Sequence, residues 1–284
     1  MTKPFKKILI TGAAGRLGTE LRRGLAPLAD SLRIVDRVAC ENVQPHEEMQ
    51  VFDLSDEAAT MAATEGCDAI VHMGGAPLER PWQDILDSNI RGSYHIFEGA
   101  RRHGAKRVIY ASSVHAIGYH KIDDGIRGDA VGRPDSLYGV SKCFVEALAS
   151  LYFDKFGIES ACCRIFSSFP EPADRRMLWS WLSFDDCIRM VSACLNAPHL
   201  GATVMAGISD NTVKPVDMSN AAHVGYVPQD SAEPFRAEVE AKTDPIDSTA
   251  PAVRNIGGWF VDLGHPDDDA RSSSEAVAQK GRNK

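Results

Sequence analysis

The stretch Y-G-V-S-K at residues 138–142 places a phenol and an ammonium group four positions apart. On a helix, Tyr138 and Lys142 would share one face, with their Cβ atoms about 5–6 Å apart. A phenol with a pKa of about 10 is a poor base near neutral pH, and a nearby cation favours its ionised form. Such a pair can take the proton of an alcohol while a hydride leaves the same carbon. The alternative is an incidental pair on a helix surface.

A hydroxyl group that could hold the reacting oxygen ends a predicted strand. The run R-V-I-Y-A-S-S at residues 107–113 reads as a buried strand that finishes at Ser113. Open α/β sheets bind their ligands at the carboxyl ends of strands, which is where Ser113 would lie. Its neighbour Ser112 would point to the opposite face of the sheet, because side chains alternate along a strand. Ser113 is therefore the better candidate.

Glycines mark the junction of the first predicted strand with the first predicted helix. The run I-L-I-T-G-A-A-G-R-L-G contains Gly12, Gly15 and Gly18. This spacing allows a tight turn and a close approach of the backbone to a pyrophosphate at the helix N-terminus. Asp36 closes the second predicted strand and could accept hydrogen bonds from ribose hydroxyls. An acid there would repel the 2′-phosphate of NADP, and this repulsion favours NAD as cofactor. The neighbouring Arg37 means that NADP is not excluded.

Strands and helices alternate over the first two thirds of the chain. Short apolar runs predict strands at residues 7–12, 32–36, 49–53, 68–75, 107–113 and 160–166. Helical periodicity predicts helices at residues 16–29, 55–65, roughly 82–103, and 136–157 with Ser136 as N-cap. The alternation predicts an α/β fold with a doubly wound parallel sheet.

The pattern weakens after residue 167. A helix is predicted at residues 183–197 and a strand at 202–209, after which proline, glycine and aspartate become frequent. We expect three parts: a dinucleotide-binding core at residues 1–166, substrate-binding and capping segments integrated with it at 167–264, and a disordered tail at 265–284.

Composition limits the function classes. The 284 residues are 44% apolar and 25% charged, as in ordinary globular proteins, and the net charge of −8 argues against nucleic acid or an anionic membrane as partner. The seven cysteines are an odd number without a C-x-x-C pair, so we expect neither a disulfide scaffold nor a metal site. No signal peptide or membrane span is evident, which favours the cytoplasm.

Taken together, the glycine pattern, G-G-A after the fourth strand, A-S-S after the fifth and Y-G-V-S-K resemble the extended branch of the short-chain dehydrogenase/reductase superfamily, over about residues 6–165. The resemblance implies a Rossmann fold that binds NAD. It implies that Tyr138 is the acid/base, that Lys142 lowers its pKa and holds the nicotinamide ribose, and that Ser113 orients the reacting oxygen. The cofactor-binding residues expected are Gly12, Gly15, Arg16, Leu17, Gly18, Asp36, Asp53, Leu54, Gly74 and Lys142. Asp53 could lie near the adenine or begin the next helix.

Further motifs resemble the uronate dehydrogenases as far as about residue 262. They are S-S-V-H-A-I-G-Y-H, R-P-D-S-L-Y-G-V-S-K-C-F, P-E-P-A-D-R-R-M-L, S-F-D-D and G-G-W-F-V-D. This resemblance implies oxidation of the anomeric C1 hydroxyl of galacturonate or glucuronate to an aldarolactone, with Arg176 binding the sugar carboxylate. The substrate-binding residues expected are Ser113, His115, Tyr138, Ser167 and Arg176. For His115, a structural role in a loop is the alternative.

Two positions depart from the uronate dehydrogenase pattern. Pro77 stands where those enzymes have a serine, and Val114 where they have an asparagine, which could change the preferred sugar. The alternatives are a dehydrogenase of another aldose or acidic sugar, a nucleotide-sugar epimerase or dehydratase, and a non-catalytic NAD-binding protein. The superfamily resemblance also implies a homo-oligomer paired through the tyrosine-bearing helix. Phe144, Leu148 and Leu151 could form that contact, or pack on the sheet instead.

Overall fold

A seven-stranded sheet forms the centre of the molecule in the computed structural model, which describes residues 2–268. All of its strand pairs are parallel, in the order β10-β7-β5-β4-β1-β2-β3. The strands are β1 (Phe5–Thr11), β2 (Ala29–Asp36), β3 (Glu47–Val51), β4 (Ala69–His72), β5 (Arg107–Ser113), β7 (Glu159–Ile165) and β10 (Ala202–Gly207). The chain runs outward from β1 to β3, then returns to build the other half, which confirms the doubly wound prediction. Most of the predicted tail lies outside the described residues.

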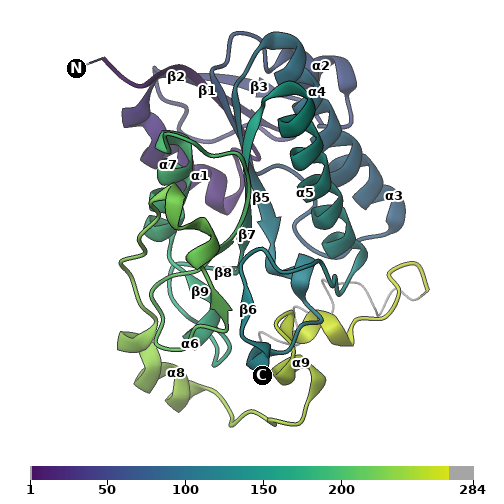
Figure 1. Cartoon of the computed structure of the whole chain (residues 1–284), viewed down its shortest axis with the longest axis vertical. Coiled ribbons are helices and arrows are strands. Elements are labelled where there is room, and N and C mark those ends of the chain that lie inside the picture. The colour runs from purple at the N-terminus through teal and green to yellow at the C-terminus, as the bar shows by residue number, and fades with distance from the viewer. Residues whose placement is uncertain (1, 269–284) are drawn as a thin grey trace.

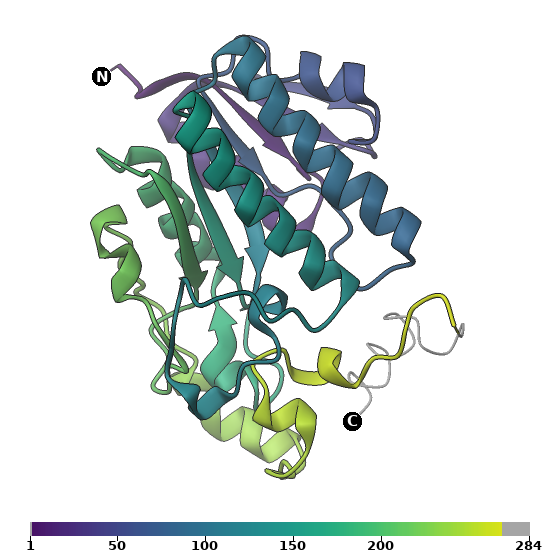
Figure 2. The ribbon, with the colours of Figure 1, turned by 45° about the vertical axis from the view of Figure 1, so that its right-hand side comes forward.

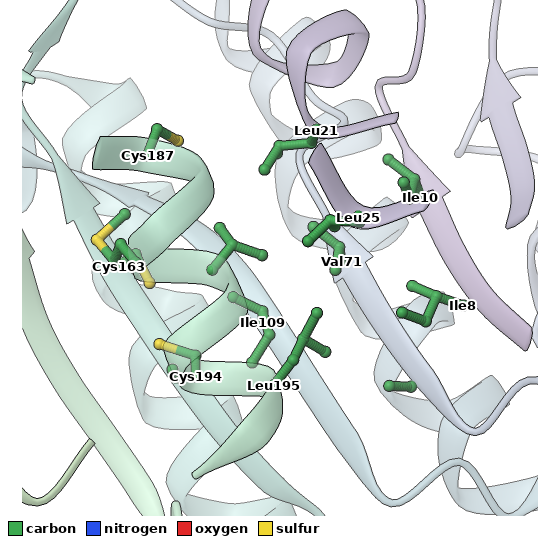
Figure 3. Packing of buried hydrophobic residues seen from close by; sticks show 14 of the residues in the cluster. Ile8, Ile10, Leu21, Leu25, Val71, Ile109, Cys163, Cys187, Cys194 and Leu195 are labelled. Atoms are coloured by element: carbon green, nitrogen blue, oxygen red, sulfur yellow. The ribbon is translucent and has the colours of Figure 1, made fainter. Parts of the chain in front are cut away.

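Helices cover both faces of the sheet, as Figure 1 shows. One face carries α1 (Arg16–Leu25) and α7 (Phe184–Asn196), and the other carries α2 (Glu57–Ala62), α4 (Gly92–His103) and α5 (Leu137–Phe156). Each face has its own apolar cluster, made by the sheet and the helices that cover it. In the first cluster, Figure 3 shows side chains of α1 and α7 packed over the sheet: Leu21, Leu25, Cys187, Cys194, Leu195, Ile8, Ile10, Val71, Ile109 and Cys163.

Three of the predicted helices are shorter than expected, and the one predicted at residues 55–65 spans only Glu57–Ala62. The first ends at Leu25, and Pro27 lies in a single 3₁₀ turn that leads into β2; a proline removes a backbone donor that a continuing helix would use. The helix predicted at roughly residues 82–103 is divided into α3 (Trp82–Ile85), a π-helical segment (Leu86–Arg91) and α4. Among residues 2–268, no helix has the length and apolar character needed to cross a bilayer.

Several small elements gather beyond the carboxyl ends of the strands, at the lower end of Figures 1 and 2. Two parallel pairs of short strands lie there: β6 (Ile126–Arg127) with β11 (Val216–Asp217), and β8 (Ser167–Ser168) with β9 (Trp181–Leu182). The helices at this end are α6 (Met177–Ser180), α8 (Arg236–Lys242) and α9 (Pro251–Arg254). These elements bring residues from the second half of the chain to the edge where the candidate site residues lie.

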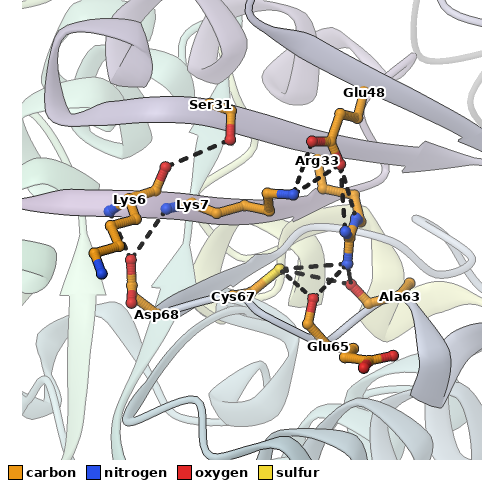
Figure 4. A network of polar contacts seen from close by, with 9 residues as sticks. All are labelled: Lys6, Lys7, Ser31, Arg33, Glu48, Ala63, Glu65, Cys67 and Asp68. Atoms are coloured by element: carbon orange, nitrogen blue, oxygen red, sulfur yellow. Dashed lines mark hydrogen bonds and ion pairs between the residues drawn. The ribbon is translucent and has the colours of Figure 1, made fainter.

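Polar contacts tie the first strands together near the amino end of the sheet (Figure 4). The carboxylate of Asp68 accepts hydrogen bonds from the backbone N–H groups of Lys6 and Lys7, at 2.6 and 3.0 Å. Glu48 on β3 forms ion pairs with Lys7 on β1 and Arg33 on β2. This region uses its charged groups to hold the strands together.

Candidate active site

Ser113, Tyr138 and Lys142 lie together at the carboxyl end of β5. Tyr138 and Lys142 are in the first turns of α5, and Ser113 is the last residue of β5. The Ser113 hydroxyl is close enough to the phenol of Tyr138 to lower its pKa, and the Lys142 ammonium is 5.1 Å from the centre of the Tyr138 ring. All three side chains are buried. The structure therefore brings the three predicted catalytic residues into one group.

Burial dominates the acid–base properties of this group. Burial raises the pKa of Tyr138, the nearby Ser113 hydroxyl lowers it and the charge of Asp135 raises it, with a net pKa of about 12. Burial also lowers the pKa of Lys142 to about 7. The Lys142 ammonium donates a hydrogen bond to the Ala111 carbonyl at 2.7 Å and lies 4.8 Å from the Tyr110 ring. Burial therefore raises the pKa of Tyr138 by more than Lys142 was expected to lower it.

The strand alternation that separates Ser112 from Ser113 is present in the structure. Ser112 donates a hydrogen bond to Glu146 on α5 at 2.6 Å, and Glu146 also pairs with the buried Arg164 on β7. Ser112 thus belongs to a network that joins strand to helix, whereas Ser113 contacts Tyr138.

Glu79 and Ser136 hold the N-terminus of α5. The carboxylate of Glu79 accepts hydrogen bonds from the backbone N–H groups of Leu137 at 3.0 Å and Tyr138 at 2.7 Å. Ser136, the predicted N-cap, accepts from Gly139 at 3.0 Å. Burial raises the pKa of Glu79, and its two backbone hydrogen bonds lower it. Sequence reasoning missed Glu79, which comes from the loop after β4 and is distant from α5 in sequence.

His115 is fixed by Asp135 and Phe260. Its Nδ1 lies 2.8 Å from the Asp135 carboxylate, whose side chain is fully buried. Its ring stacks on Phe260, with 3.6 Å between ring centres and 24° between planes, and lies edge-on to Tyr138 at 5.8 Å. A carboxylate only accepts hydrogen bonds, so Nδ1 carries the proton, and Nε2 of the neutral ring is an acceptor. Asp135 and Phe260 were not predicted as site residues.

Arg176 is held by neutral groups. Its Nη1 donates to the Ser167 hydroxyl at 2.7 Å and the Ser180 hydroxyl at 3.3 Å, and its Nη2 donates to the Ile256 carbonyl at 2.6 Å. Nε is buried and has no hydrogen-bond partner within residues 2–268, and no carboxylate there forms an ion pair with this guanidinium. Burial lowers the pKa of Arg176. A half-buried cation without an ion-pair partner suits an anionic group of a ligand.

Close backbone packing shapes the glycine turn. Gly12 has φ of +68°, and a Cβ atom there would lie 2.7 Å from the backbone nitrogen of Gly74. A Cβ atom on Gly18 would lie 2.0 Å from the Gly12 carbonyl oxygen. Gly15 is the N-cap of α1, and no side chain caps that helix end. The turn has the compact backbone and the open helix N-terminus that a dinucleotide pyrophosphate requires.

Two acids lie at the carboxyl ends of neighbouring strands, Asp36 as the last residue of β2 and Asp53 just after β3. The Asp36 carboxylate, at the end of β2, accepts a hydrogen bond from the backbone N–H of Ala14 in the glycine turn at 3.0 Å. Asp53 lies two residues after β3 and accepts from the backbone N–H of Ser55 at 2.9 Å, which lowers its pKa. The helix that follows has Asp56 as N-cap, so Asp53 belongs to the preceding turn.

Apolar and cationic side chains complete the cofactor side. Leu54 approaches Gly74 so closely that a Cβ atom there would lie 2.7 Å from Leu54 Cδ1. Leu17 packs against the apolar cluster under α1. The guanidinium of Arg16 lies 4.0 Å from the centre of the Phe169 ring, in the segment after β8. Arg16 and Leu17 thus follow the glycine turn directly, and Leu54 packs beside Gly74, which approaches Gly12.

The two departures from the uronate dehydrogenase pattern lie in different environments. Val114 is only 3% exposed and belongs to an apolar cluster with Phe166 and Ile256. Pro77 is exposed in the loop that leads to Glu79. Because Val114 is part of the core, its apolar side chain matches its local surroundings.

Comparisons with known proteins agree with this geometry. Residues 8–183 match the model of the NAD dependent epimerase/dehydratase family. A uronate dehydrogenase of Pseudomonas syringae pv. tomato is 49% identical over 92% of this chain and 95% of its own. The glucuronic acid dehydrogenase of Chromohalobacter salexigens is 46% identical, with a TM-score of 0.91 over 93% of this chain and all of its own. A uronate dehydrogenase of Agrobacterium tumefaciens, solved with NAD, is 45% identical, with a TM-score of 0.88 over 91% of this chain and 98% of its own. The chain belongs to the NAD dependent epimerase/dehydratase family and, within it, to the uronate dehydrogenases.

Proposed function

We propose that this protein oxidises the C1 hydroxyl of a hexuronic acid, galacturonate or glucuronate, to an aldarolactone with NAD. The observation that carries the proposal is the pairing of two features at the carboxyl end of the sheet. One is the Ser113–Tyr138–Lys142 group, and the other is Arg176, a guanidinium held by neutral partners. The first suits removal of a proton from an alcohol, and the second suits a carboxylate on the same small molecule.

Each side chain has a role in this reaction. Ser113 holds the C1 oxygen, and Tyr138 takes its proton. Arg176, which donates a hydrogen bond to Ser167, binds the carboxylate at the far end of the sugar. His115 accepts a hydrogen bond from a sugar hydroxyl through Nε2, because Asp135 occupies Nδ1. Lys142, fixed against the Ala111 carbonyl, holds the nicotinamide ribose.

The cofactor side supplies the electron acceptor. NAD accepts the hydride from C1 and, in its oxidised form, brings a positive ring that favours the phenolate of Tyr138. Gly12, Gly15 and Gly18 form the turn for the pyrophosphate, and Asp36 is placed to bind the adenosine ribose. Arg16, Leu17, Asp53, Leu54 and Gly74 would line the remaining cofactor surface.

We also propose a cytoplasmic homo-oligomer. All seven cysteines are free thiols, as a reducing compartment would maintain them. On α5, Val140, Phe144 and Leu151 are exposed apolar residues, whereas Leu148 packs on the sheet. Light scattering of the wild type and of Phe144→Glu tests the oligomeric state, and we expect the variant to lose the multimer. Cell fractionation tests the compartment.

NADH absorbance tests the proposed reaction. Purified protein with NAD is expected to form NADH from galacturonate or glucuronate far faster than from galactose or glucose, which lack the carboxylate. Tyr138→Phe should lower turnover by about 10²–10⁴-fold while calorimetry shows NAD affinity close to that of the wild type. An epimerase would accumulate no free NADH, and a non-catalytic protein would be unaffected by Tyr138→Phe. Equal rates with neutral and acidic sugars would contradict the uronate proposal.

A further inference from the structure

Residues 256–260, here called the 256–260 turn, contact the candidate site from the far end of the chain. The carbonyl of Ile256 accepts from Arg176 Nη2 at 2.6 Å, and Phe260 stacks on His115. Between them, Gly257 faces Asp135 and Gly258 faces Arg176. One short segment therefore touches both side chains proposed to bind the sugar.

The contact with Arg176 leaves no space for a side chain. Gly258 has φ of +66°, and a Cβ atom there would lie 2.7 Å from Nε, 3.0 Å from Cδ and 3.3 Å from Cζ of Arg176. Nε is the buried guanidinium nitrogen that has no hydrogen-bond partner in the described chain. The guanidinium can therefore occupy this position only because residue 258 has no side chain.

The contact with the His115 side is equally close. A Cβ atom on Gly257 would lie 1.9 Å from Asp135 Oδ2, and one on Gly118 would lie 1.8 Å from the same oxygen. The Asp135 carboxylate is therefore confined between two glycine backbones while it accepts from His115 Nδ1. Phe260 completes this arrangement, with its ring centre 6.2 Å from that of Tyr138.

The turn is itself anchored to the body of the protein. The backbone N–H of Ile256 donates to the His120 carbonyl, and that of Gly257 donates to the Gly118 carbonyl, each at 2.9 Å. Ile256 is fully buried in the apolar cluster that contains Val114. The turn therefore has a fixed position against which Arg176 and Asp135 can be placed.

We propose that the 256–260 turn is a positioning element for uronate oxidation, and that Gly258 orients Arg176 toward the substrate carboxylate. The proposal rests on the proposed function. A guanidinium binds a carboxylate best when its plane is aligned for two parallel hydrogen bonds, so a displacement of Arg176 should weaken binding of acidic sugars. Binding of the cofactor, which involves the other side of the site, should not change.

A pair of glycine variants separates this role from backbone strain. Gly258→Ala places a Cβ against Arg176, whereas Gly66→Ala introduces the same left-handed strain, at φ of +71°, with nothing within 4 Å. For Gly258→Ala we expect KM for the uronate to rise about 10-fold or more, with kcat and the Kd for NAD within about 3-fold of the wild type. Gly66→Ala should keep the wild-type KM. Equal KM values in the two variants would overturn the proposal.

Two further measurements make the test specific. In an Arg176→Met background, Gly258→Ala should raise KM no further, because the group it displaces is absent. If Gly258→Ala does not fold, Phe260→Leu tests the turn without altering its backbone. Loss of the ring that stacks on His115 should lower kcat/KM for the uronate about 10-fold with NAD affinity retained, and wild-type kcat/KM would overturn the proposal. Failure of the wild type to oxidise uronates would instead contradict the proposed function.

Discussion

A carboxylate oxygen of Glu79 accepts a hydrogen bond from the backbone N–H of Tyr138 at 2.7 Å. The acid from the loop after β4 thus holds the residue proposed as the base, and its other oxygen accepts from Leu137. A helix N-terminus has backbone donors without intrahelical partners, and a negative charge there is favoured by the helix dipole. Glu79 thereby fixes the start of α5 on which Tyr138 and Lys142 lie.

Replacing Glu79 should destabilise the protein. Glu79→Ala removes the acceptor for two N–H groups at the helix N-terminus, of which that of Tyr138 is buried, and we expect the free energy of unfolding to fall by about 1–3 kcal/mol. Urea unfolding measures this. Glu57→Ala, which removes an exposed acid from the first turn of α2, serves as the control and should cost much less. Equal losses in the two variants would contradict the capping role of Glu79.

Lys142 should make stability depend on pH in a defined direction. Its pKa in the folded chain is about 7, below its ordinary value of 10.5, so the unfolded chain binds more protons between these pH values. Burial of this ammonium therefore lowers the free energy of unfolding by its full amount below about pH 7. This loss of stability becomes smaller as pH rises toward 10.5. We expect Lys142→Met to stabilise the fold by about 1–3 kcal/mol near neutral pH, with the gain shrinking at higher pH.

Urea unfolding of wild type and Lys142→Met over a series of pH values checks this. Lys6→Met, at an exposed position, is the control. A stability difference that does not change with pH would show that the ammonium is not penalised by burial.

Asp135 should affect the pH dependence of turnover through Tyr138. Its negative charge raises the pKa of Tyr138, so Asp135→Asn should lower that pKa and move the rising limb of the kcat profile to lower pH. The variant should also lose the carboxylate that holds His115 Nδ1, and kcat/KM for the uronate should fall about 10-fold. Rate profiles against pH measure both effects, and a wild-type profile with reduced kcat/KM would limit Asp135 to its structural contact.

Arg176→Lys tests the carboxylate-binding role with the charge retained. An ammonium cannot form the two parallel hydrogen bonds of a guanidinium, so KM for the uronate should rise about 10–100-fold with little change in NAD affinity. Arg175→Lys is a matched control, because Arg175 donates to backbone carbonyls of Glu240, Thr243 and Asp244. Steady-state kinetics of both variants decide the matter, and a larger effect at Arg175 would exclude the assignment.

Much of the fold could be predicted from local sequence. The alternation of strands and helices, the Ser136 cap and the helix at residues 183–197 all depend on neighbours in the chain. The interruption before α4 could not, because it accompanies a tertiary contact. Asn89, in the π-helical segment, is buried and donates to the Ala76 carbonyl and the Ser141 hydroxyl. The short strands beyond the sheet each pair only two residues and leave no periodic pattern.

Part of the candidate site could also be predicted from local sequence, and part depends on tertiary contacts. Tyr138 and Lys142 are four residues apart, and their shared helix face follows from spacing alone. Asp135 is twenty residues from His115, and Phe260 comes from the end of the described chain, so their contacts arise only on folding. The motif G-G-W-F-V-D supported the family resemblance, but the steric role of its glycines becomes visible only when Arg176 and Asp135 are placed beside them.

The contact between Arg16 and Phe169 joins the proposed cofactor side of the site to the proposed sugar side. Arg16 follows the glycine turn, and Phe169 lies in the segment that begins with Ser167. Any movement of the guanidinium toward a phosphate changes its packing on the ring and hence the segment behind it. If nucleotide binding moves Arg16 in this way, the binding of nucleotide and of sugar would be coupled, and each would change the other's affinity by the same factor.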